Sequence, residues 1–269
     1  MLNPNYLTFT GIMRYFLQLS YNGNAYHGWQ IQPNAVSVQE IMNERLSLLL
    51  KTNIMLTGCG RTDTGVHARE FFAHFDFPET WSQQECTQLG YKLDKFLPYD
   101  IAVYKVFQVK DAAHARFSAA SRTYNYLISL QKDPFMDLFA YHFSIPLDLE
   151  AMNHCAKILL EYKDFACSSK VDNDSMTTDC ILKEISWTQH NNQLIFSIKA
   201  NRFLRNMVRA IVGTLMDIGR GRYGEEKLRE ILGSGNRRQA GESVPAHGLY
   251  LQKVEYPESI FMAPHRLDP

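Results

Sequence analysis

The chain has 269 residues, of which 45% are apolar, and its 28 Lys or Arg balance 28 Asp or Glu. This composition can fill the core of one large domain or two smaller ones, and it excludes a disordered or fibrous protein. No run approaches the roughly 20 apolar residues of a membrane span. The five cysteines are scattered without a Cys-x-x-Cys pair, so neither a disulfide framework nor a zinc ribbon is indicated. We expect a cytoplasmic protein that does not associate with membranes.

The first half of the chain predicts the element order β-α-β-β-α-β. Alternating apolar residues predict strands at 13–21, from 54 onward, at 71–77 and at 101–108. Ser37 with Glu40, and Ser82 with Glu85, have the spacing of capping boxes and predict helices at about 38–50 and from 82 to about 96. This is the element order of a ferredoxin-like unit with an antiparallel sheet.

The second half repeats that order. Strands are expected at 122–130, 181–189, 194–200 and 249–254, and helices at 148–162, 203–218 and near 225–232. The strands at 181–189 and 194–200 are expected to form a hairpin that turns at Asn191-Asn192. The sequence therefore predicts an α+β fold of two ferredoxin-like units. The N-terminal domain would cover residues 13–110 and the C-terminal domain 111–269, with residues 1–12 as a dispensable extension.

The loop at residues 60–68, Gly-Arg-Thr-Asp-Thr-Gly-Val-His-Ala, is the most informative local feature. Gly60 and Gly65 permit backbone angles that other residues resist, so the loop can bring the Asp63 carboxylate close to a ligand. Asp63 is therefore the candidate catalytic residue. The structural alternative is that Asp63 only folds this turn by bonding its own backbone.

Basic residues concentrate in one part of the second half. Residues 201–238 hold nine Lys or Arg against four Asp or Glu, a local charge of +5, whereas 133–180 carry −6. On the expected helix at 203–218, three arginines line up opposite the apolar face. Arginines interleaved with aromatics are typical of RNA contacts, although a solvated face is the more usual meaning of such a stripe. The set comprises Arg116, Arg122, Tyr124, Arg202, Arg205 and Arg209.

Taken together, these motifs resemble those of the A-type tRNA pseudouridine synthases, and the resemblance runs from Tyr15 to about Tyr256. The Gly-Arg-Thr-Asp loop is highly specific, and the other segments become decisive in combination. The segments that carry the resemblance are Tyr21-Asn22-Gly23, Gly28-Trp29-Gln30, Val38-Gln39, residues 60–68, Leu97-Pro98, residues 114–119 and 121–126, Asp164-Phe165, Met207-Val208-Arg209, Val212-Gly213 and residues 248–251.

The resemblance implies a homodimer that isomerises uridine to pseudouridine at positions 38–40 in the anticodon stem-loop of tRNA, with no cofactor and no metal. It also implies that the active site lies in a central RNA-binding cleft between the two units. It implies Asp63 as the catalytic carboxylate, Arg209 as its basic partner and Tyr124 as the ring that stacks on uracil. Whether the carboxylate attacks the sugar, attacks the base or removes a ribose proton stays open. Arg61 resembles the arginine that helps to displace the target nucleotide. The residues expected to bind tRNA are Arg61, Thr62, Gly65, His67, Arg116, Arg122, Arg202 and Arg205.

The sequence leaves two other classes of protein to be considered. Doubled ferredoxin-like units also occur as catalytically silent RNA-binding modules, although Asp63 beside Arg209 argues against one here. An Asp-dependent hydrolase would need a second carboxylate or a metal ligand near Asp63, and Asp76 is the candidate. Asp179 stands where the family often has an arginine, so one RNA contact is expected to be missing or moved.

Overall fold

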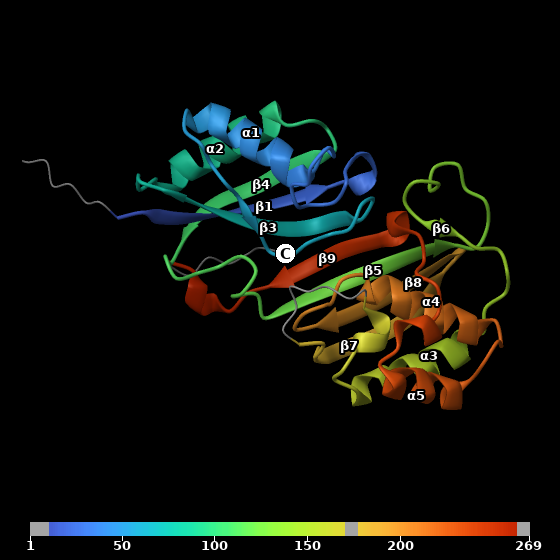
Figure 1. Ribbon diagram of the computed structural model, residues 1–269. Helices are drawn as coiled ribbons and strands as arrows, with labels where there is room; N and C mark the ends of the chain where they lie inside the picture. Colours follow the sequence, from blue (N-terminus) through green and yellow to red (C-terminus); the bar gives the residue numbers. More distant parts are fainter. Residues whose placement is uncertain (1–10, 170–176, 263–269) are drawn as a thin grey trace, which may run out of the picture.

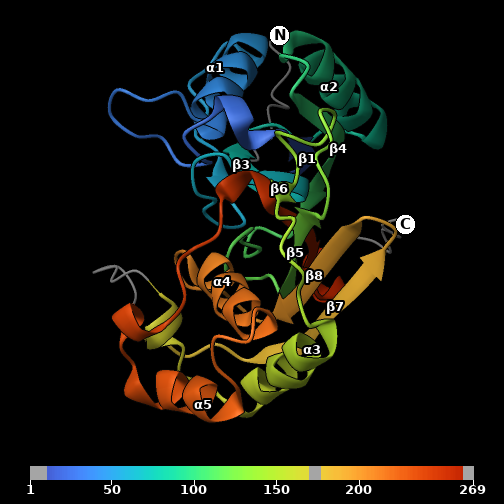
Figure 2. The ribbon, with the colours of Figure 1, turned by 90° about the vertical axis from the view of Figure 1, so that its right-hand side faces the viewer.

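The computed structural model describes residues 11–169 and 177–262, so the expected extension at residues 1–12 lies almost wholly outside the described residues. One long sheet forms the centre of the molecule, with strand order β4-β1-β3-β9-β5-β8-β7; β2 pairs with β3, and β6 with β5. The helices stand in two groups, α1 with α2 over one end of the sheet and α3, α4 and α5 over the other (Figures 1 and 2).

The described strands are β1 (Met13–Tyr21), β2 (Thr57–Gly58), β3 (His67–Phe77), β4 (Ile101–Val109), β5 (Ser121–Ser129), β6 (Tyr141–His142), β7 (Leu182–His190), β8 (Gln193–Ala200) and β9 (Leu249–Glu255). The α-helices are α1 (Val38–Leu50), α2 (Gln83–Phe96), α3 (Leu149–Ile158), α4 (Met207–Gly219) and α5 (Glu225–Ser234). The expected α+β class is confirmed by this mixture.

Local signals located several elements well. Both capping boxes are present: Ser37 caps α1 and Ser82 caps α2, and in each case the glutamate three residues later accepts a hydrogen bond from the cap residue's backbone. The buried stripe of α1, Val38, Met42 and Leu46, has the expected helical spacing. The β7–β8 hairpin turns at Asn191, whose φ of 52° is left-handed, as asparagine tolerates.

The prediction of a separate antiparallel sheet in each half is wrong, because a single sheet runs through both. The halves join where β3 pairs with β9 in parallel, at His67↔Tyr250 and Ala68↔Leu251. The strands then diverge, and the Glu70 carboxylate accepts a hydrogen bond from the Val254 backbone N–H at 2.9 Å. This seam lies directly after the loop that carries Asp63.

Two helix predictions also need correction. The helix expected at 148–162 ends at Ile158 and continues as a 3-10 turn over Leu159–Glu161. The helix expected at 203–218 begins only at Met207, because Asn206 has a left-handed φ of 66° and breaks the helical path. Arg202 and Arg205 therefore precede α4 and do not share a helix face with Arg209.

After β9 the chain returns to the first half and covers the second face of its sheet. The Tyr256 ring packs edge-on against Phe16 and Phe72, and Phe261 packs against Phe107. Lys110 donates a backbone hydrogen bond to the carbonyl of Ile260. The neighbouring β3 residues Phe71 and Phe72 are consequently both buried, although they point to opposite faces of the strand.

Candidate functional site

The Asp63 loop is shaped mainly by the segment that follows β1, residues 22–29. The Trp29 N–H donates to the carbonyl of Thr62, and the Gly65 N–H donates to that of Tyr26, each at 3.3 Å. Gly28 makes this approach possible, because a Cβ there would lie 2.2 Å from the Thr62 carbonyl oxygen. Of the two glycines that bracket Asp63, Gly65 adopts the expected left-handed φ, 78°. The Asp63 carboxylate itself is left to face Arg209.

Asp63 and Arg209 form the ion pair that the sequence predicted. Arg209 Nη1 lies 3.5 Å from Asp63 Oδ2, and the side chains are 21% and 31% exposed, respectively. Arg209 Nε donates a 2.7 Å hydrogen bond to the carbonyl of Val244, which fixes the plane of the guanidinium. A carboxylate that is partly exposed and held in a defined orientation can act as a nucleophile or as a base.

The segment at 240–244 that orients Arg209 packs directly on α4. A Cβ at Gly213 would lie 1.8 Å from the Glu242 carbonyl oxygen, so the two backbones are in contact. Ser243 Oγ accepts hydrogen bonds from Asn206 Nδ2 at 2.6 Å and from Arg237 Nη2 at 2.8 Å. Sequence reasoning missed Ser243 and Arg237, because neither contacts Asp63 and no local pattern marks them.

Tyr124 lies on β5 between Leu251 of β9 and Ile198 of β8. Its side chain is buried, and its ring meets that of Phe203 edge-to-face at 5.1 Å. Burial raises the pKa of the Tyr124 hydroxyl well above its usual range; the Asp63 charge acts in the same direction, and the Arg122 charge opposes it. The hydroxyl is therefore neutral at physiological pH, and the site combines a fixed aromatic ring with a carboxylate.

Three of the residues expected to bind substrate are instead engaged with the protein. Thr62 Oγ1 shares a buried 2.8 Å hydrogen bond with the Tyr21 hydroxyl. His67 Nδ1 accepts from the Gly23 N–H at 3.1 Å, and His67 Nε2 donates to the carbonyl of His247 at 3.0 Å. Burial lowers the pKa of His67, so the ring stays neutral and joins the two halves of the chain. The third residue is Arg122, whose guanidinium bonds to backbone carbonyls.

The other arginines of the expected set are more accessible. Arg61, Arg116 and Arg205 are exposed, and Arg202 is half-buried. The Arg116 guanidinium lies 5.6 Å from the centre of the Phe117 ring, which is itself 76% exposed. These side chains could meet phosphates and bases from the surface of the molecule.

The second carboxylate that a hydrolase would need is not supplied by Asp76. Asp76 is nine residues beyond His67 on β3, about 30 Å at 3.3 Å per residue. It also forms a two-pronged ion pair with Arg14, at 2.7 and 2.8 Å. In the described ranges, 11–169 and 177–262, no group of three His, Cys, Asp or Glu could hold a metal ion, and no helix is long and apolar enough to cross a membrane.

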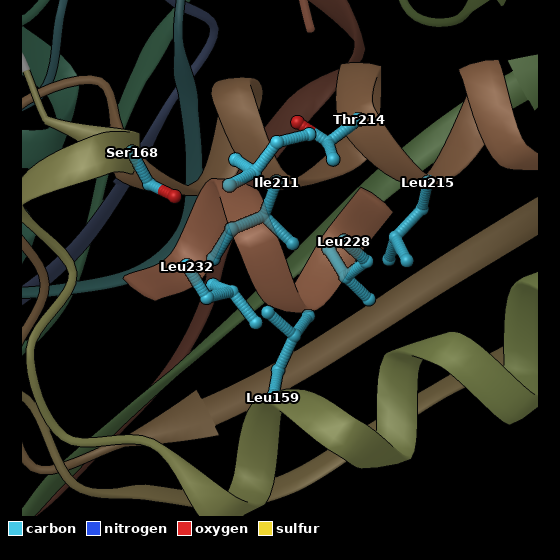
Figure 3. A pocket seen from close by; sticks show the side chains of 8 residues that line it. Leu159, Ser168, Ile211, Thr214, Leu215, Leu228 and Leu232 are labelled. Atoms are coloured by element: carbon cyan, nitrogen blue, oxygen red, sulfur yellow. The ribbon is translucent and has the colours of Figure 1, made fainter. Parts of the chain in front are cut away.

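A small cavity elsewhere in the second half is not a ligand site. It has a volume of about 10 Å³ and lies where α4, α5 and Leu159 meet (Figure 3). Leucine and isoleucine side chains dominate its lining, and the space would hold one water at most. The cavity is a packing defect of the core.

Comparison with known proteins gives one consistent answer. A family model described as tRNA pseudouridine synthase matches residues 156–257. The tRNA pseudouridine synthase A of Parabacteroides distasonis is 47% identical over 248 residues, which cover 92% of this chain and 98% of the relative. The proteins of the same name from Bacteroides fragilis and Chlamydia muridarum are 45% and 37% identical, over 93% and 90% of this chain and 99% and 91% of the relatives.

Proposed function

The chain belongs to the tRNA pseudouridine synthase A family, as its motifs indicated, and we propose that it isomerises uridine to pseudouridine in tRNA without a cofactor. The reaction breaks the bond between N1 of uracil and C1′ of the ribose, turns the base, and joins C5 to the same C1′. C5 loses a proton and N1 gains one, so the change is redox-neutral and needs no electron carrier. The observation that carries the proposal is the Asp63–Arg209 pair beside the buried ring of Tyr124.

Each of these residues has a defined task in the proposed reaction. Asp63 supplies the carboxylate that reacts with the sugar, the base or a ribose proton. Arg209 balances its charge and, because the Val244 carbonyl orients the guanidinium, also fixes the direction in which the carboxylate points. Tyr124 offers its ring to the uracil, and Phe203 supports that ring from the side.

The surface arginines are the proposed tRNA contacts. Arg61 assists displacement of the target nucleotide from its stack. Arg116, Arg202 and Arg205 contact the phosphate backbone, and Gly65 lets the RNA approach the loop closely. Thr62, His67 and Arg122 leave this group, because their polar atoms are used within the protein.

Several finer features remain part of the proposal. The target is a uridine at positions 38–40 of the anticodon stem-loop, and the enzyme works as a cytoplasmic homodimer. The domains, 13–110 and 111–269, are each read as ferredoxin-like units with the RNA cleft between them. Apart from the short β6, the strands of the two halves follow the same order, β4-β1-β3-β2 in the first half and β9-β5-β8-β7 in the second. This shared order supports the interpretation.

The function is tested by incubating an unmodified tRNA transcript with the protein and no cofactor. Pseudouridine is then located by carbodiimide derivatisation and reverse-transcription stops, with the mass of the RNA expected to stay unchanged. The control is the same transcript with cytidine at positions 38–40. Pseudouridine formed only outside positions 38–40 would reject the proposed target position. Complete absence of pseudouridine would reject the proposed activity in favour of an RNA-binding protein.

A further inference from the structure

Arg122, at the beginning of β5, donates four hydrogen bonds to backbone carbonyls. Its Nε and Nη2 both reach the carbonyl of Cys59, at 3.3 and 2.8 Å. Nη2 also bonds to the carbonyl of Arg116 at 2.6 Å, and Nη1 to that of Asn201 at 2.9 Å. A guanidinium has five N–H donors, so at most one is left for another partner.

The three carbonyls belong to three separate parts of the active site. Cys59 lies four residues before Asp63 and is anchored to β3, because its N–H donates to the Phe72 carbonyl. Asn201 begins the segment that leads through Arg202 to Arg209, and its side chain accepts hydrogen bonds from the backbone of Ile181 and Arg202. Arg116 lies in the connection between the two halves of the chain.

That connection is itself held firmly against the first half. Arg14 Nη1 donates to the Ala113 carbonyl at 2.8 Å. The Ala115 N–H donates to His74 Nδ1 at 3.1 Å, and the Tyr256 hydroxyl donates to the Ala115 carbonyl at 2.5 Å. The carbonyl of Arg116 is therefore fixed in place. By bonding to it, Arg122 holds the segments that begin at Cys59 and Asn201 at defined positions relative to the connection.

We propose that Arg122 is a positioning residue: its guanidinium sets the distance between Asp63 and Arg209 by bonding the segments that carry them, and it does not contact RNA. The proposal rests on the proposed function for its effect on the reaction rate. The planar, five-donor fork is the feature that matters, because a lysine ammonium is a single point and cannot span carbonyls from three segments. A positive charge at position 122 is therefore insufficient without the planar fork of donors.

The test compares Arg122→Lys and Arg122→Gln with wild type and with Arg222→Gln. Arg222 is an exposed arginine paired with Asp217 at 2.7 Å, so its replacement removes the same charge away from Asp63. Three quantities are measured: amide hydrogen exchange of the peptide 58–66 in the free protein, the dependence of tRNA affinity on salt, and the single-turnover rate of pseudouridine formation at saturating tRNA.

Both Arg122 variants are expected to exchange at least about tenfold faster at 58–66, without a matching change in α2, and to react at least about tenfold more slowly. Their log–log salt slopes should equal that of wild type. Arg222→Gln should match wild type in all three measurements.

The contrary results are distinct. If Arg122 contacts a phosphate, Arg122→Gln will flatten the salt slope by about 0.7 to 0.9, Arg122→Lys will restore it, and exchange at 58–66 will stay at the wild-type rate. Either a flattened slope or unchanged exchange overturns the proposal, as does faster exchange throughout the protein, which would indicate only general destabilisation. If wild type forms no pseudouridine, the proposed function fails, while exchange and salt slope still decide what Arg122 does.

Discussion

Replacing Asp63 by Asn separates its catalytic role from any role in folding the loop. The change is nearly isosteric: it removes the negative charge and replaces one acceptor oxygen by an NH2 donor. The loop keeps the backbone hydrogen bonds from Trp29 to Thr62 and from Gly65 to Tyr26, since neither involves the carboxylate. What is lost is one ion pair at 3.5 Å, between side chains that are 21% and 31% exposed.

The cost to stability should therefore be small. Partly exposed ion pairs contribute about 0.2 to 1 kcal/mol, and for a protein of this size 1 kcal/mol corresponds to a change in Tm of about 2 to 4 °C. The cost to the reaction should be far larger, because an amide can serve neither as a nucleophile nor as a base. We expect the Tm of Asp63→Asn within about 4 °C of wild type and no detectable pseudouridine.

The assay is single-turnover pseudouridine formation on an unmodified tRNA transcript, with tRNA affinity and Tm measured on the same preparations. Asp76→Asn is the matched control, because it also neutralises a paired aspartate on the same stretch of chain. The hydrogen bond and charge of Arg14 lower the pKa of Asp76, so this control should lose stability at neutral pH while keeping its rate. A rate for Asp63→Asn within about tenfold of wild type, roughly 1.4 kcal/mol of barrier, would refute the reasoning.

Three further predictions concern Tyr124, His74 and Gly213. Tyr124→Leu should slow the single-turnover rate more than Tyr124→Phe, because stacking needs the ring; a wild-type rate in the Leu variant would contradict this. Burial lowers the pKa of His74 to about 4, so the folded state favours the neutral ring. The free energy of unfolding should therefore fall by about 3 kcal/mol as the pH drops from about 6.5 toward 4. Urea unfolding of His74→Gln should show a weaker pH dependence over that range, whereas the exposed control His190→Gln should follow wild type; identical slopes in all three would refute the assignment. Gly213→Ala should displace the backbone at Glu242 and lower the unfolding free energy by about 1 to 3 kcal/mol. It should also slow the reaction, because the displaced segment includes the Val244 carbonyl that orients Arg209. An unchanged unfolding free energy and an unchanged rate would contradict this prediction.

The sequence by itself determined the elements whose signals are local. The helices α1 and α2 begin where Ser37 and Ser82 stand, because a capping box closes hydrogen bonds between residues three positions apart. The hairpin turn at Asn191 follows from the tolerance of asparagine for left-handed angles. The Asp63 loop and its pairing with Arg209 were also identified, since the residue types and their order are specific enough to mark the family.

Tertiary structure decided what depends on partners distant in the chain. The apolar pattern alone extended α4 back to residue 203, but Asn206 adopts a left-handed angle and bonds to Ser243, 37 residues later. Two separate sheets satisfy the strand pattern as well as one does, and the parallel pairing of β3 with β9 made them continuous.

The same reason explains the reassigned polar residues. His67 and Arg122 are residue types that often contact RNA. In the folded chain, however, both imidazole nitrogens of His67 bond to backbone groups of other segments. All three guanidinium nitrogens of Arg122 likewise bond to backbone carbonyls. A side chain's chemistry can be read from the sequence, whereas the partner that uses it is fixed only when the chain has folded and buried polar groups must find hydrogen bonds.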